Sequence, residues 1–157
     1  MAILQLENLD IRDKRVLIRE DLNVPLIDGK IASDARIRAA LPTLEYTVRH
    51  GAKVMVMSHL GRPKEGSPMK LQPEFSLKPV AARIQELSGL TVRLEDSYLE
   101  GVSFGDEDIV LFENIRANVG EKANNESLAR KLASLADIFV MDAFATAHRA
   151  QASTEGV

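Results

Sequence analysis

Four short apolar segments, each followed at once by a cluster of polar residues, are the feature that most constrains the fold of this chain. They span residues 16–18, 53–57, 109–112 and 138–141, and the last two show no polar alternation, which is typical of strands buried on both faces of a sheet. Amphipathic helical patterns begin near residues 33, 76 and 124, between the apolar segments. Strands that alternate with helices predict βαβ units and a parallel sheet.

This pattern predicts an α/β fold with three layers, in which an open, mostly parallel, Rossmann-like sheet carries helices on both faces. The 157 residues are enough for one domain with a substantial core, and no linker divides residues 1–157. We also expect a short strand at residues 91–94, a hairpin that turns at Asp28-Gly29 and a long exposed loop over residues 61–73. Pro42 interrupts the first helical pattern, so either a kink or the start of the main helix is expected there.

Composition argues against several classes of protein. The chain has no Cys, which excludes disulfides and thiolate metal sites and agrees with a reducing cytoplasm. No apolar run approaches the ~20 residues of a membrane helix, and the start of the chain has no signal-peptide pattern. A net charge of −3 and an aromatic content of 4% argue against nucleic-acid binding. We therefore expect a cytoplasmic protein with neither a membrane nor a nucleic acid among its partners.

Basic side chains recur in the polar clusters that follow the strands and at the start of the first helix. They are Arg36, His59, Arg62, Arg116, His148 and Arg149. Because ligands bind outside the carboxyl ends of parallel strands, we expect these side chains along one edge of the sheet. Guanidinium groups suit phosphate and carboxylate, so this edge predicts a site for a small phosphorylated acid or sugar. Asp21 and Asn23, two residues apart after the first strand, would point the same way and orient a hydroxyl group.

Structural interpretations of the same residues stay open at this point. A single Arg in a loop is usually a solvated surface group, and a lone His near a strand end is more often structural than catalytic. Asp21 is able to cap the turn that follows it, and Asn23 is able to bind the backbone. The sequence pattern alone does not separate these roles from ligand binding.

Neither a metal site nor a nucleotide site is predicted in this chain. His59, His148 and Asp142 have no recognisable metal-ligand spacing. Residues 61–67 have the glycine frame of a P-loop but lack the Lys that should follow the second Gly. We therefore expect an anion site that binds no cofactor.

Five motifs resemble the N-terminal domain of bacterial phosphoglycerate kinases. In chain order they are residues 19–25 (REDLNVP), 33–37 (SDARI), 58–63 (SHLGRP), 113–116 (ENIR) and 142–150 (DAFATAHRA). Their order and spacing are those of the family, and the resemblance extends over essentially all 157 residues. It implies a glycolytic enzyme that transfers a phosphoryl group reversibly between 1,3-bisphosphoglycerate and ADP, giving 3-phosphoglycerate and ATP.

The resemblance also implies a role for each side chain of the edge. Asp21 and Asn23 would contact the hydroxyl and carboxyl end of the glycerate, and Arg36 would be the catalytic residue that stabilises charge on the transferring phosphoryl group. The other implied substrate-binding residues, which include the basic patch around the non-transferred phosphate, are His59, Leu60, Gly61, Arg62, Arg116 and Arg149. His148 and Asp142 are implied to support them.

In the family a second domain of similar size carries the nucleotide and its magnesium, and this chain stops at Val157, before that domain would begin. We therefore expect part of a larger, monomeric enzyme, whose Mg-ATP or Mg-ADP site and C-terminal domain lie elsewhere. The chain alone is expected to bind 3-phosphoglycerate or 1,3-bisphosphoglycerate without turnover. Competing hypotheses are a stand-alone binding module for a phosphorylated metabolite and an interaction domain with a basic surface. Ala117 and Ala145 replace the usual Phe and Gly of the family, and both are expected to be tolerated.

Overall fold

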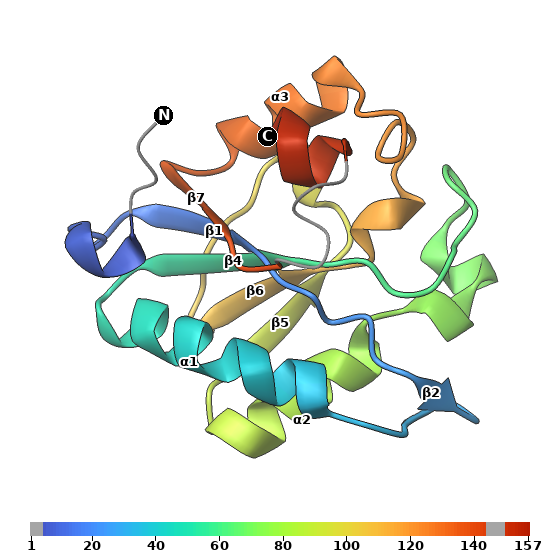
Figure 1. Cartoon of the computed structure of the whole chain (residues 1–157), viewed down its shortest axis with the longest axis horizontal. Coiled ribbons are helices and arrows are strands. Elements are labelled where there is room, and N and C mark those ends of the chain that lie inside the picture. Colours follow the sequence, from blue (N-terminus) through green and yellow to red (C-terminus); the bar gives the residue numbers. More distant parts are fainter. Residues whose placement is uncertain (1–4, 144–149) are drawn as a thin grey trace.

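A five-stranded parallel sheet, in the order β5-β6-β4-β1-β7, forms the centre of the computed structural model, which describes residues 5–143 and 150–157 (Figure 1). Its strands are β1 (Arg15–Arg19), β4 (Lys53–Met57), β5 (Val92–Glu95), β6 (Ile109–Phe112) and β7 (Ile138–Met141). All four apolar segments predicted as strands are confirmed, and β5 is the short strand expected at residues 91–94. Arg19 of β1 lies in register with Met57 and Met141, so three chain segments leave the sheet side by side.

Helices cover both faces of the sheet, which confirms the predicted three-layer α/β fold (Figure 1). On one face lie α1 (Ala35–Arg49) and α2 (Lys78–Ser88), and α3 (Glu126–Ser134) lies on the other. The helix α1 is unbroken across Pro42, which excludes a helix that begins at this residue. None of the helices in residues 5–143 and 150–157 combines the length and the apolar character that a bilayer crossing requires.

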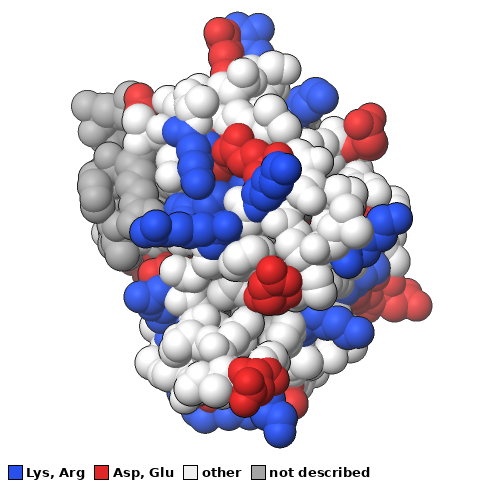
Figure 2. Space-filling model, turned by 90° about the vertical axis from the view of Figure 1, so that its right-hand side faces the viewer, with Lys and Arg blue, Asp and Glu red and all other residues white. Residues whose placement is uncertain are grey.

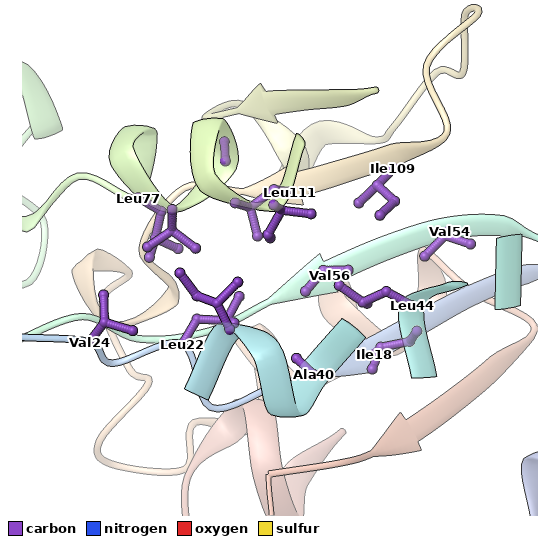
Figure 3. Close-up of a cluster of buried hydrophobic side chains, with 14 of the residues drawn as sticks. Ile18, Leu22, Val24, Ala40, Leu44, Val54, Val56, Leu77, Ile109 and Leu111 are labelled. Atoms are coloured by element: carbon purple, nitrogen blue, oxygen red, sulfur yellow. The ribbon is translucent and has the colours of Figure 1, made fainter. Parts of the chain in front are cut away.

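Strand side chains alternate between two hydrophobic clusters, one on each face. Figure 3 shows the cluster between the sheet and helices α1 and α2, to which Ile18, Val56 and Leu111 of three strands, Leu44 of α1 and Leu77 at the start of α2 all belong. The alternate strand positions, such as Leu17 and Met55, pack on the other face with α3. Because both sets are removed from water, the strands read as continuous apolar runs in the sequence.

The segments between these elements agree with the sequence in part. The hairpin β2 (Leu26–Ile27) and β3 (Lys30–Ile31) turns at Asp28-Gly29 as predicted, with φ angles of 52° and 76°. The loop over residues 61–73 is less open than expected, since it holds a 3₁₀ turn at Met69–Leu71. It also contains Gln72, whose buried side chain binds backbone atoms of the same loop.

The connections between strands define where a ligand site is expected. The chain leaving β1 and β4 enters helices on one face, whereas the chain leaving β6 enters α3 on the opposite face. Because β4 and β6 are neighbours, the connections diverge between their carboxyl ends. Ligands of open α/β sheets bind at such a switch point. A helical turn at Ala152–Gly156, which the sequence pattern does not predict, packs against α3.

Candidate functional site

The segments that leave β1, β4, β6 and β7 all lie at the carboxyl edge of the sheet, because these strands are parallel. Figure 2 views this side of the molecule, and Lys and Arg side chains gather in the upper part of the face. A chain of net charge −3 thus places a local group of cations at this edge. Such a group concentrates anions at one surface of an otherwise acidic protein.

Five predicted residues are joined by one series of polar contacts across this edge. Arg36 Nη1 lies 2.5 Å from the carbonyl oxygen of Asn23 and 3.4 Å from Asp21 Oδ1. Asn23 Oδ1 accepts a hydrogen bond from the Gly61 N–H at 2.9 Å. Arg116 Nη1 donates to the Gly61 carbonyl oxygen at 3.3 Å. The loops that follow β1, β4 and β6 are therefore fixed to one another and to the first turn of α1.

Both structural roles considered for Asp21 and Asn23 occur in the structure. Asp21 Oδ1 accepts a hydrogen bond from the Asn23 N–H at 3.2 Å and closes the turn after β1. Asn23 Oδ1 is bound to Gly61. Within the described residues, Asp21 Oδ2 and Asn23 Nδ2 make no hydrogen bond, so each side chain retains one polar atom for a ligand. Their contacts to a glycerate stay a prediction.

The basic residues after β4 differ in their surroundings. Arg62 is exposed and forms no hydrogen bond or ion pair with another described residue. His59 is only 4% exposed, and its Nδ1 lies 3.0 Å from Nη2 of the buried Arg19. The described part of the chain does not include Ala145, His148 and Arg149, so the roles predicted for them stay predictions.

Two residues that the sequence analysis noted only as parts of a motif hold the loops in place. Asn114 is 1% exposed; it accepts from the Leu60 N–H at 3.3 Å and donates to the carbonyl oxygens of Leu60 at 2.7 Å and Phe75 at 2.8 Å. Leu60 is thus held through its backbone, while its side chain lies in the core. Glu113 accepts from the Leu77 N–H at 2.7 Å and caps the start of α2.

A pair of carboxyl groups, one buried and one partly buried, follows β1 and β7, and the sequence does not reveal it. Glu20 is 2% exposed, and Asp142 follows the neighbouring strand, where its N–H donates to the Arg19 carbonyl oxygen at 3.0 Å. Burial, together with the hydrogen bond to Asp142 and its charge, raises the pKa of Glu20 to about 10 although the nearby Arg19 lowers it. Glu20 is therefore protonated at neutral pH and shares its proton with Asp142. The role predicted for Asp142, to support the substrate-binding residues, stays a prediction.

A surface pocket of about 490 Å³ opens beside the contact series, and Asn23 and Arg36 are among the residues that line it. A larger pocket, of about 810 Å³, lies between residues 66–70, residues 96–99 and the start of α3, and none of the predicted site residues lines it. No group of three or more His, Asp or Glu side chains in the described ranges is arranged to hold a metal ion. The anion-binding character of the smaller pocket rests on Arg36.

Gly61 is expected to be intolerant of a side chain. Its φ is +59°, and an added Cβ would lie 2.8 and 2.9 Å from two ring carbons of Phe75. Gly61→Ala combines left-handed strain with this clash, so we expect it to lower the free energy of unfolding by about 3 kcal/mol in urea denaturation followed by circular dichroism. Gly89→Ala is the matched control, with φ +74° and no atom within 4 Å of the added Cβ, and should cost about 1 kcal/mol. Equal losses would show that the packing on Phe75 does not matter.

Comparison with known proteins gives a consistent result. A family model described as phosphoglycerate kinase matches residues 6–157. A solved structure of phosphoglycerate kinase from Coxiella burnetii is 52% identical with a TM-score of 0.92, and the match covers 99% of this chain and 39% of that one. The crystal structure of phosphoglycerate kinase from Pyrococcus horikoshii OT3 is 32% identical with a TM-score of 0.78, covering 98% and 40% of the two chains. The chain therefore spans about two fifths of the length of these proteins.

Proposed function

The chain belongs to the phosphoglycerate kinase family, and from this premise we propose that it supplies the 3-phosphoglycerate-binding part of such an enzyme. The enzyme would transfer a phosphoryl group reversibly between 1,3-bisphosphoglycerate and ADP, giving 3-phosphoglycerate and ATP. The observation that carries this proposal is the series of contacts that links Arg36, Asn23, Gly61 and Arg116 at the carboxyl edge of the sheet. These contacts bring Asn23, which is suited to bind a hydroxyl group, close to the cations Arg36 and Arg116.

The substrate would lie along this edge. Asp21 Oδ2 and Asn23 Nδ2 are suited to the hydroxyl and carboxyl groups of the glycerate, because one accepts and the other donates hydrogen bonds. The non-transferred phosphate would lie against His59, Arg62 and Arg116, which follow β4 and β6. Charge-assisted hydrogen bonds from these groups to phosphate oxygens are stronger than neutral ones.

Arg36 is suited to act on the other phosphoryl group. Its ion pair with Asp21, at 3.4 Å between partly exposed side chains, is worth less than about 1 kcal/mol. The guanidinium can therefore leave this partner and follow the charge that develops on a transferring phosphoryl group. Cations that stabilise this charge are a major source of rate enhancement in phosphoryl transfer.

The nucleotide is assigned to the part of the relatives that this chain does not span. Family membership implies a nucleotide as the second substrate, and we place Mg-ATP or Mg-ADP in that other part. The two reactants would then meet when both parts close on each other, which excludes water and sets the geometry of transfer. We assign the enzyme to the cytoplasm, where glycolysis operates.

The 157-residue chain is expected to bind 3-phosphoglycerate in a calorimetric titration without catalysing phosphoryl transfer from ATP. Binding needs only the carboxyl edge, whereas transfer requires both reactants to be held in line. Glycerol 3-phosphate, which lacks the carboxylate, is the matched ligand control and should bind about tenfold more weakly. Measurable kinase activity of the chain, or equal affinity for the two ligands, would contradict this assignment of roles.

A further inference from the structure

Arg19 is a buried cation to which the proposed mechanism assigns no role. It is the last residue of β1, and its side chain is fully buried. Nη1 donates to the Glu20 carbonyl oxygen at 2.7 Å, and Nε donates to Ser153 Oγ at 3.2 Å. Nη2 lies 3.0 Å from Nδ1 of His59. One guanidinium therefore joins β1, the segment after β4 and the helical turn at Ala152–Gly156.

The contact with His59 determines which ring nitrogen carries the proton. A guanidinium has five donors and no acceptor, so the Nδ1 atom facing it must offer a lone pair. An imidazole that accepts at Nδ1 is neutral and carries its proton on Nε2. We propose that Arg19 is a positioning residue that holds His59 in this tautomer, so that His59 offers an Nε2–H donor to the substrate phosphate. The donor role of His59 toward the phosphate rests on the proposed function, whereas its tautomer does not.

The hydrogen-bond partners of Arg19 fix the orientation of its guanidinium group. Ser153 binds Arg19 Nε and is itself held by Glu121, whose carboxylate accepts from the Ser153 N–H at 3.1 Å and from its hydroxyl group. Glu121 is 1% exposed, so this anchor is buried as well. Nε and Nη1 are thus bound to Ser153 Oγ and the Glu20 carbonyl oxygen, and Nη2 faces Nδ1 of His59. Among the described residues, the carboxyl groups of Glu20 and Glu121 interact with the charge of Arg19, and Asp142 and Arg116 act in turn on Glu20 and Glu121.

The tautomer can be read without any ligand by nitrogen-15 NMR of the histidine side chains in the 157-residue chain at pH 8. His50 is an internal control, because its Nδ1 lies 2.7 Å from the Tyr46 carbonyl oxygen, which only accepts, and must carry the opposite tautomer. We expect His59 to be protonated on Nε2. In Arg19→Met the His59 signals should shift toward a tautomer mixture while those of His50 stay unchanged. A proton on Nδ1 of His59, or no shift in Arg19→Met, would overturn the inference.

A second test does not depend on whether Arg19→Met folds. Gln places its amide nitrogen near the position of Nε2, whereas Asn places its amide near Nδ1. If His59 acts as an Nε2–H donor, His59→Gln should bind 3-phosphoglycerate within about threefold of wild type, and His59→Asn about tenfold more weakly. Equal losses in both variants would overturn the donor role. A wild-type chain with the expected tautomer that binds no 3-phosphoglycerate would contradict the proposed function instead, leaving the link between Arg19 and His59 supported.

Discussion

Arg36→Ala is expected to lower kcat of phosphoryl transfer about a thousandfold in the enzyme that combines this chain with the nucleotide-binding part of its relatives. Arg36 lies in the first turn of α1, and 51% of its side chain is exposed toward the carboxyl edge. Its charge would act on the transferring group, where negative charge shifts in the transition state. In the proposed arrangement other cations would bind the substrate in the ground state, so KM for 3-phosphoglycerate should change less than about tenfold. A coupled steady-state assay measures both constants.

Arg38→Ala is the matched control for this variant. Arg38 lies on the same helix with a side chain that is 58% exposed, but it pairs with Asp34 instead of the residues after β1. Loss of this exposed pair should change kcat less than about twofold, since such pairs contribute little. If the two variants lost activity equally, the net charge of α1 would matter and not the position of Arg36. A rise in KM with unchanged kcat would make Arg36 a ground-state binding residue.

The strands are the part of this fold that the sequence predicts best. β4, β6 and β7 occupy the residues expected from their apolar runs. Burial of β4 and β6 on both faces leaves no polar alternation to obscure them, and β7 is partly buried along its whole length. The order of the strands is not readable in the same way. β5 follows α2 in the chain, and among the described strands it pairs with β6 alone, at the sheet border. This arrangement depends on which face each connection covers. Periodicity contains no such information.

The candidate site was likewise predictable only in part from the sequence. The placement of Asp21, Asn23 and Arg36 at one edge follows from the rule that parallel strands end together, and the structure brings them into contact. The roles of Arg19 and Glu20 could not be predicted, because charged residues after an apolar run usually face solvent. β1 instead lies between β4 and β7, which buries both side chains. Their partners Ser153 and Asp142 come from the other end of the chain, beyond the reach of local patterns.

Glu20→Gln is expected to make the protein more stable than wild type as pH rises from 5 to 8. The folded state holds Glu20 protonated with a pKa of about 10, whereas the unfolded chain releases this proton near its ordinary pKa of 4.5. Above that value the unfolded state binds fewer protons, so the stability of the wild type falls with rising pH until the folded-state pKa is reached. The cost is about 1.4 kcal/mol per pH unit, or up to about 4 kcal/mol between pH 5 and 8.

Gln removes this cost because it cannot ionise, and its amide N–H can replace the proton that Glu20 shares with Asp142. The measurement is the difference in free energy of unfolding between Glu20→Gln and wild type, from urea titrations at several pH values. This difference should grow steadily with pH, while other titrating groups cancel because both proteins share them. Glu100→Gln, at an exposed position, should give no such trend. A difference for Glu20→Gln that stays constant with pH would mean that Glu20 is ionised in the folded protein, with Arg19 rather than Asp142 as its dominant partner.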